Sequence, residues 1–219
     1  MRTSVAILTL LLAFSVAAAT PATKNLFAEA ARPGWQPIAF DTSSTFTVLP
    51  SNTFTCARGK PLAGIVYTNA VPTMNYEVTL DAMRVEGSDF FIGLTLPIET
   101  NFFTVIIGGW GGSLCGISSF DYNDASQNPW SESVALENNR WYTLRVRITP
   151  GVLQIFLNDT LYRARIEFDD ATHFSLRPGE IEQSKPFGLT TYETVAHWRN
   201  LRIVPITQML PADKQQKEP

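Results

Sequence analysis

The residues best suited to chemistry in this sequence lie between Gly108 and Trp130. The stretch opens with Trp110 inside a Gly-Gly-Trp-Gly-Gly run. Glycine allows strained turns and lets a ligand approach the backbone closely. The apolar face of an indole suits stacking on the C–H face of a sugar ring. The run therefore predicts a sugar platform at Trp110. The alternative is a glycine-rich bend in which Trp110 fills the core.

A loop dense in short polar side chains follows this run. Its amides and carboxylates suit recognition of hydroxyl groups, so Asn123, Asn128 and Trp130 are predicted to bind substrate together with Trp110. The same composition is typical of a calcium loop, although the spacing lacks the glycine and glutamate of an EF-hand. A divalent cation such as Ca²⁺ at the Asp121–Asp124 loop is one expectation, and no other cofactor is predicted. A solvated turn is the alternative, because Asp and Asn are common turn formers.

Short β-strands must position these residues. Gly, Pro, Asn and Asp interrupt the chain at short intervals, and the runs between them are rich in β-branched and aromatic residues, as in a β-sandwich or barrel. Alternation of apolar and polar residues predicts strands at 76–82 and 142–148, each with one face in the core. The apolar runs 90–96 and 102–107 are predicted to be central strands covered on both faces, with residues 97–101 as the loop between them.

Turn and bulge signals complete the strand pattern. Residues 152–157 and 160–168 are predicted to form a hairpin around Asn158-Asp159, because both turn residues tolerate φ > 0. The last strand is expected at 195–203, with a bulge near Arg199 or Asn200, where the apolar alternation changes parity. The strands together predict an all-β fold of two antiparallel sheets.

The N-terminus predicts export. Arg2 precedes an apolar run, and Ala17-Ala18-Ala19 offers the small residues of a cleavage site. The predicted domains are a helical signal peptide at 1–19, one sandwich domain at 20–206 and a disordered polar tail at 207–219. The protein is expected to be secreted or periplasmic, without stable membrane insertion after cleavage. An uncleaved anchor is the alternative, although the run is shorter than the about 20 residues that span a bilayer.

Charge and cysteine content narrow the functional classes. The net charge is −3 over 219 residues. Nucleic-acid binding needs a clustered basic face, and the acids and bases here are interspersed, so no nucleic-acid partner is expected. Export permits a disulfide between Cys56 and Cys115. Two buried thiols are the preferred alternative, since both residues lie in apolar, strand-like surroundings.

Several segments, taken in order, are similar to one family, the 3-keto-disaccharide hydrolase domain family, also called the 3-keto-glucoside lyase/hydratase domain. The resemblance covers residues 25–205 and implies a concanavalin-like jelly-roll sandwich, export from a bacterial cell and a small saccharide or glycan as partner. The segments are CARGKPLAG at 56–64, DFFIGLT at 89–95, GGWGG at 108–112, KPFGL at 185–189 and WRNLRI at 198–203.

The resemblance also implies a reaction. In a 3-keto sugar the ketone acidifies the hydrogen on C2, so a base removes that proton, the glycosidic oxygen leaves by elimination, and water adds afterwards. Asp121, Asp124 and His197 are the candidate bases, and Arg177 or Lys185 is the candidate cation that steadies the enolate. A hydrogen-bonded strand histidine and solvated surface charges are the alternatives.

Three hypotheses about function remain open at this point. Many relatives carry a His-bearing segment in mid-chain that this sequence lacks, so a non-catalytic carbohydrate-binding module stands beside an enzyme that cleaves a 3-keto saccharide. A protein-interaction sandwich is the third, because a fold does not set function. An acid or His with a strongly perturbed pKa in a closed cleft would favour the enzyme. An open aromatic face would favour the binding module. A large exposed apolar patch would favour the protein-binding domain.

Overall fold

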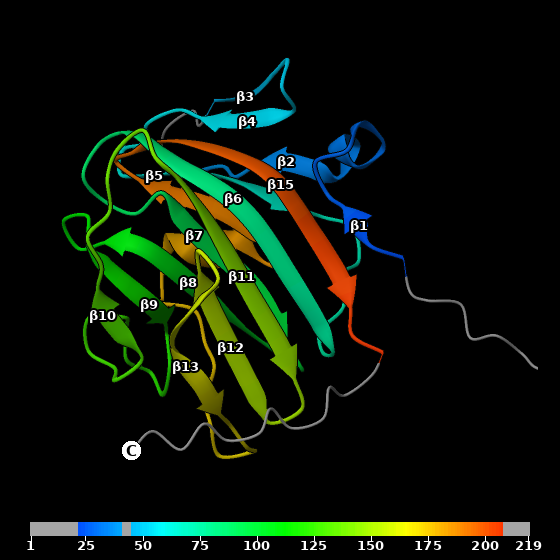
Figure 1. Ribbon diagram of the computed structural model, residues 1–219, viewed down its shortest axis with the longest axis vertical. Helices are drawn as coiled ribbons and strands as arrows, with labels where there is room; N and C mark the ends of the chain where they lie inside the picture. Colours follow the sequence, from blue (N-terminus) through cyan, green and yellow to red (C-terminus); the bar gives the residue numbers. More distant parts are fainter. Residues whose placement is uncertain (1–21, 41–44, 208–219) are drawn as a thin grey trace, which may run out of the picture.

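Two antiparallel β-sheets pack face to face in the computed structural model, which describes residues 22–40 and 45–207 (Figure 1). The strands of sheet A are β1 (Lys24–Asn25), β3 (Phe46–Leu49), β4 (Thr53–Cys56), β6 (Tyr76–Glu86), β11 (Trp141–Thr149), β12 (Val152–Leu157), β13 (Thr160–Glu167) and β15 (Val195–Pro205). The strands of sheet B are β2 (Trp35–Pro37), β5 (Leu62–Tyr67), β7 (Ile92–Ile98), β8 (Asn101–Gly109), β9 (Leu114–Ser118), β10 (Ser131–Ser133) and β14 (Gly188–Tyr192).

The chain crosses repeatedly between the two sheets. The order in sheet A is β13-β12-β11-β6-β15-β4-β3, with β1 against β15, and the order in sheet B is β10-β9-β8-β7-β14-β5-β2. Strands adjacent in the sequence, such as β4 and β5 or β14 and β15, lie in different sheets. This is a jelly-roll sandwich, so the predicted fold class is confirmed.

The core lies between the sheets, where alternate residues of paired strands meet. Leu80 of β6 pairs with Leu144 of β11, and Val78 pairs with Val146, and all four side chains are buried. The predicted core faces of both strands are therefore confirmed. Trp198 of β15 closes this core, and its indole N–H donates to a carbonyl oxygen in the segment that leads into β7.

The strands β7 and β8 are buried on both faces, as predicted. The connection between them is tighter than the predicted loop, because β7 continues through Pro97 and Ile98 and the turn falls at Glu99, whose φ is 52°. Strand β14 pairs only with Gly93–Thr95 of β7. The missing N–H of Pro97 therefore breaks no ladder on that side, which is why the strand tolerates proline.

The predicted hairpin and bulge are both present. Asn158 and Asp159 take φ values of 51° and 61° between β12 and β13, the left-handed pair that a tight hairpin turn requires. The register of β15 against β6 shifts between Arg199 and Arg202, and Asn200 takes a φ of 56° within the bulge.

The cysteines face the interior from opposite sheets, Cys56 from β4 and Cys115 from β9. Both are buried and neither forms a disulfide. Burial raises the pKa of the Cys56 thiol to about 12 and that of Cys115 to about 11. The preferred interpretation of two buried thiols is confirmed.

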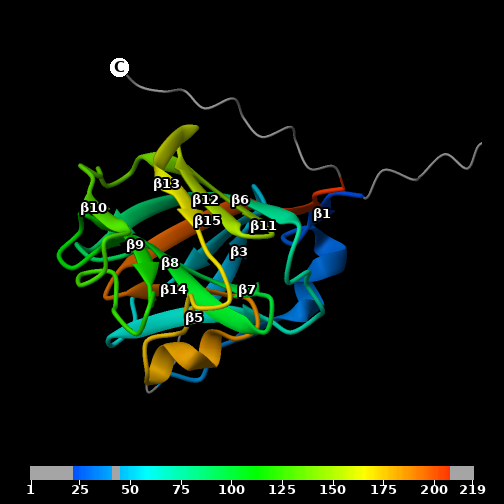
Figure 2. The same cartoon turned by 90° about the horizontal axis from the view of Figure 1, so that it is seen from below.

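Two short 3₁₀ helices lie outside the sandwich, η1 (Glu29–Gly34) and η2 (Glu180–Ser184). Figure 2 shows η2 under β5, on the outer side of sheet B. No helix in the described ranges is long and apolar enough to cross a membrane. The predicted signal peptide and all but the first residue of the predicted tail lie outside the described residues, so export and these boundaries stay predictions.

Candidate functional site

A groove crosses the outer face of sheet B. It consists of two adjoining hollows, of about 180 and 250 Å³, that share the side chains of Phe90, Trp110, Arg177 and Tyr192. The rings of Phe90 and Tyr192 pack together with their centroids 5.9 Å apart. Together the hollows are of the size of small-molecule pockets, roughly 300 to 1,000 Å³.

Strand β8 forms part of the floor of the groove. Thr104 and Ile106 line it, since Val105 between them points into the core. On the neighbouring strands, a Cβ on Gly93 would collide with the hydroxyl of Thr190. Strand β7 therefore needs a glycine at this position, and no side chain projects from it on the outer face of the sheet beside the groove.

Trp110 stands at the tip of the turn between β8 and β9. Its φ is 49°, a left-handed value that is rare for a bulky residue, and 41% of its surface is exposed. The carboxylate of Asp89 holds the turn, because one oxygen accepts the Phe90 N–H at 2.7 Å and the other accepts the Gly111 N–H at 3.1 Å. Trp110 therefore does not fill the core. It is presented at the groove by a braced, strained turn, a feature that marks functional sites.

Arg84 braces the same turn from the inside of the sandwich. It lies on the core-facing side of β6 and is only 5% exposed. Its Nη1 donates to the carbonyl oxygen of Gly112 at 3.0 Å, and its Nη2 donates to that of Leu136 at 2.9 Å. Its Nε donates to Asn138 Oδ1 at 2.6 Å. Burial lowers the pKa of the Arg84 guanidinium from its ordinary value. The buried cation is thus used to satisfy acceptors around the Trp110 turn.

The polar loop after β9 is held by its own hydrogen bonds. The Asn128 amide nitrogen donates to the carbonyl oxygens of Ile117 at 2.7 Å and Asp124 at 2.8 Å, and its oxygen accepts the Trp130 N–H at 2.9 Å. Asn123 is exposed and donates to the carbonyl oxygen of Asp121 at 2.8 Å. These amides fix the shape of the loop, and neither lines the groove.

Trp130, also a predicted substrate contact, packs against the core. Its ring lies edge-on to Phe120 with centroids 5.9 Å apart. Its indole nitrogen is buried and has no hydrogen-bond acceptor among the described residues. Of the four predicted substrate contacts, Trp110 alone lines the groove.

Asp124 is linked to the groove through Arg177. Its Oδ2 lies 3.9 Å from Arg177 Nη1, while its Oδ1 accepts the Ser126 N–H at 2.9 Å. Asp121 points elsewhere, because its Oδ1 accepts the backbone N–H of His173 at 2.9 Å. The fold therefore brings one predicted base beside one predicted cation at the edge of the groove.

His197 lies away from the groove, and Lys185 is not among the residues that line it. His197 is on the outer side of β15, in sheet A, so the whole sandwich separates it from Trp110. Burial lowers the pKa of this imidazole. Lys185 extends over the ring of Phe102, 6.0 Å from its centroid. His197 therefore cannot act together with Asp124 and Arg177 without a large rearrangement.

The calcium prediction gains no support from the arrangement of the loop. Within the described ranges, no three His, Cys, Asp or Glu side chains gather as they would around a metal ion. The oxygens of Asp121 and Asp124 accept hydrogen bonds from neighbouring backbone N–H groups. A cation at the Asp121–Asp124 loop remains an untested prediction.

The sequence offered weak signals for the other groove residues. Phe90 was predicted to begin the buried strand 90–96, Asp89 directly precedes it, and Tyr192 lies at the end of β14. An aspartate followed by an aromatic residue just before an apolar run is a clue to Asp89 and Phe90. Nothing in the sequence places Tyr192 beside Trp110, because only the pairing of distant strands does so.

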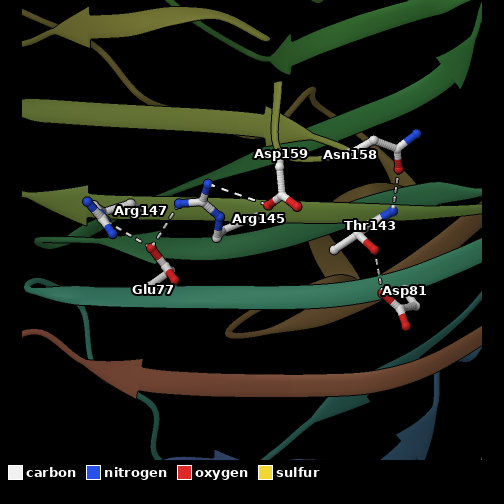
Figure 3. A network of polar contacts seen from close by, with 7 residues as sticks. All are labelled: Glu77, Asp81, Thr143, Arg145, Arg147, Asn158 and Asp159. Carbon is white, nitrogen blue, oxygen red and sulfur yellow. Dashed lines mark hydrogen bonds and ion pairs between the residues drawn. The ribbon is translucent and has the colours of Figure 1, made fainter. Parts of the chain in front are cut away.

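The outer face of sheet A is built differently (Figure 3). Glu77 accepts from Arg147 at 2.8 Å and lies 3.5 Å from Arg145, so one carboxylate serves two guanidinium groups. Asp81 accepts from the Thr143 hydroxyl at 2.7 Å. Guanidinium groups also cover two aromatic rings on this face. The Cζ atom of Arg145 lies 3.7 Å from the ring centroid of Phe156, and that of Arg199 lies 3.9 Å from the ring centroid of Trp141.

Comparisons with known proteins place this site in context. Among solved structures, the carbohydrate-binding module CBM66 from Bacillus subtilis is similar, with a TM-score of 0.53 and 13% identity over 78% of this chain and 95% of that one. The Crh5 transglycosylase in complex with NAG has a TM-score of 0.54 and 11% identity over 87% and 85% of the two chains. A putative glycosyl hydrolase from Parabacteroides distasonis has a TM-score of 0.51 and 12% identity over 84% and 100%.

At such low identity these structures share the fold with this chain, and the likeness extends no further. No curated protein sequence matches the chain. The model of the 3-keto-alpha-glucoside-1,2-lyase-like domain matches residues 61–204, which is well over half of the chain and includes the turn that carries Trp110. The chain therefore belongs to the 3-keto-alpha-glucoside-1,2-lyase-like domain family.

Proposed function

We propose that the groove on sheet B binds a saccharide, with Trp110 as the face on which a sugar ring stacks. The observation that carries this proposal is the exposed Trp110, held in a left-handed conformation beside Tyr192 and Arg177. Aromatic faces with a few polar groups beside them are the usual way in which proteins bind sugar rings. A carbohydrate-binding module and a transglycosylase with bound NAG among the similar structures support the same class of ligand.

Binding is tested at two tryptophans, one whose ring lines the open groove and one whose ring is covered by an arginine. Trp110→Ala should weaken the binding of trehalose or methyl α-glucoside by about thirty-fold, as expected for a central aromatic contact worth about 2 kcal/mol. Trp141→Ala is the matched control, because Arg199 covers its ring on the opposite face, and it should leave binding unchanged. Calorimetric titration measures both. Equal effects of the two substitutions would contradict a site at Trp110.

Cleavage of a 3-keto-glucoside is the second candidate function. The specific observation in its favour is the pair at the edge of the groove, where Asp124 Oδ2 lies 3.9 Å from Arg177 Nη1. In this scheme Asp124 takes the proton from C2, Arg177 stabilises the enolate oxygen, and the C1–O bond breaks. Water protonates the leaving oxygen, so the aglycone departs as an alcohol, and a second water molecule then adds to the C1–C2 double bond. The domain family supports a 3-keto sugar as the substrate.

The reaction is tested by incubating the purified protein with 3-keto-trehalose and 3-keto-glucosides and following the release of sugar. Asp124→Asn should abolish release while it retains the Oδ1 acceptor for Ser126. Asp121→Asn is the matched control and should keep most of the activity. A parallel sample with EDTA tests the predicted cation. No release from any 3-keto substrate, together with normal saccharide binding, would leave a non-catalytic binding module.

Export belongs to the proposed function as well. Residues 1–19 have the composition of a signal peptide, and a saccharide outside the cytoplasm would then be the ligand. Fractionation of the producing cell, with N-terminal sequencing of the exported protein, tests this, and the chain should begin near Thr20. A full-length chain retained in the cytoplasm would contradict it.

A further inference from the structure

The groove on sheet B is chemically uneven along its length. Asp89 lines one hollow only, and Arg177 lines both where they adjoin. The other, at about 250 Å³, is the larger, and most of the side chains that line it are apolar. Beyond the residues that both hollows share, its apolar lining consists of Pro61, Leu62, Ile106, Pro178 and Ile181.

The apolar hollow continues an apolar cluster that is separate from the core. Leu62, Ile106 and Phe90 are buried with Ile38 and Phe40 on the outer side of sheet B. The outward positions of an antiparallel sheet that faces water are usually polar. A cluster of this kind that opens into a hollow favours an apolar ligand group over water.

Helix η2 forms the wall opposite the sheet and is anchored to it. Ser184, at the end of η2, is buried, and its hydroxyl lies 2.6 Å from the Thr95 hydroxyl of β7. The same hydroxyl donates to the Ile181 carbonyl oxygen, also at 2.6 Å. Ile181 is thus held over the floor formed by β8, and the hollow is preformed.

We infer that the ligand is a glycoside with an apolar, aromatic aglycone. Its sugar lies at the end of Asp89, Trp110 and Arg177, and its aglycone lies between Ile181 and the floor. Beyond the shared residues, only Thr104 and Ser118 bring polar groups to the second hollow, so it has few partners for the hydroxyl groups of a second sugar and suits an apolar ring. This inference rests on the proposed saccharide binding and names the substrate class of the same groove.

A matched ligand series tests the aglycone. Methyl α-glucoside and phenyl α-glucoside, each also as the 3-keto derivative, are titrated calorimetrically into the purified protein. The phenyl compound should bind about ten-fold more tightly, because its ring is removed from water. Ile181→Ser should reduce this preference to about three-fold or less, because the phenyl ring loses its apolar cover. Val48→Ser is the control, because Val48 is an exposed apolar residue on the edge strand β3 of sheet A.

The possible outcomes separate this inference from the function on which it rests. If methyl and phenyl glucosides bind equally well, saccharide binding stands and the aromatic aglycone is refuted. If phenol alone binds as tightly as phenyl glucoside, the groove is a general apolar pocket and the glycoside is refuted. If no glucoside of either form binds, the proposed function and this inference both fail.

Discussion

The two outer faces of the sandwich use their side chains in opposite ways. On sheet A the charged residues neutralise one another, as where Glu77 contacts both Arg145 and Arg147 (Figure 3). Guanidinium groups also cover the aromatic rings of Phe156 and Trp141 on this face. On sheet B the strands carry small residues such as Gly93 and Thr104, and a turn and a helix rise around them.

The difference shows that a charged or aromatic face is not by itself a site. Trp141 and Trp110 are both tryptophans outside the core, yet Arg199 covers the ring of Trp141, whereas Trp110 lines an open groove. A side chain can bind a ligand only if neighbouring side chains do not already occupy its ring or its charged group.

The largest expected effect separates a buried arginine from a surface one. Arg84→Met should lower the free energy of unfolding by about 3 kcal/mol, because the carbonyls of Gly112 and Leu136 lose their donor inside the protein. Arg145→Met should cost at most about 1 kcal/mol, since Glu77 keeps its shorter contact with Arg147 and no buried charge is left unpaired. Urea unfolding measures both. Similar losses would show that Arg84 is not a brace.

Two neighbouring glycines sharpen the account of the Trp110 turn. Gly111→Ala should cost about 1 kcal/mol from its positive φ alone, since a Cβ there meets nothing within 4 Å. Gly112→Ala should cost about 2 kcal/mol, because its Cβ would also lie 2.9 Å from Arg84 Nη1 and from the Ser88 carbonyl oxygen. Thermal unfolding gives the order, and a reversed order would mean that the Arg84 contact is not tight.

The thiol between the two faces makes stability depend on pH. The pKa of Cys56 is raised to about 12 when folded, against about 8.5 in an unfolded chain. Above about pH 8.5 the thiol keeps its proton in the folded protein and loses it in the unfolded chain. Its contribution to the stability of the folded state is therefore complete below about pH 8.5 and is lost as the pH rises. Between pH 7 and pH 9 the free energy of unfolding of the native protein should fall by about 1 kcal/mol more than that of the Cys56→Ala variant. Parallel urea curves that do not differ in this way would contradict burial of the thiol.

The smallest effect is expected on the outer face of sheet A. A double-mutant cycle of Glu77→Gln and Arg147→Met should give a coupling of about 0.5 kcal/mol that falls with added salt. Saccharide binding should be unchanged in both variants, since the groove lies on the other sheet. A change in binding would mean that the two faces are not independent.

Much of the fold was predictable, because it depends on local patterns. Alternation identified the core faces of β6 and β11, the pair Asn158-Asp159 marked a hairpin, and the change of parity before Leu201 marked the bulge of β15. The predicted loop between β7 and β8 was too long. Pro97 indicated a loop, but it lies at a position in β7 where a strand tolerates proline.

The candidate site was predictable only in part. The glycine run indicated Trp110 as a platform, and Trp110 does line the groove. Asn128 and Trp130 looked equally suitable from their types, but Asn128 holds the loop and Trp130 packs against the core. Residue type states which interactions a side chain can make, and it does not state whether the surrounding chain has already used them.

The sequence by itself determined the longer strands, the Asn158-Asp159 hairpin and the bulge of β15, and it indicated a glycine-rich turn at Trp110, since these depend on neighbours in the chain. The tertiary structure decided that Asp89 and Arg84 brace this turn, that Tyr192 and Arg177 complete the groove, and that His197 faces the other side. Those outcomes depend on which strands pair and which sheet each one joins. The hydrogen bonds and apolar contacts that decide this pairing join residues far apart in the chain, and no local pattern records them.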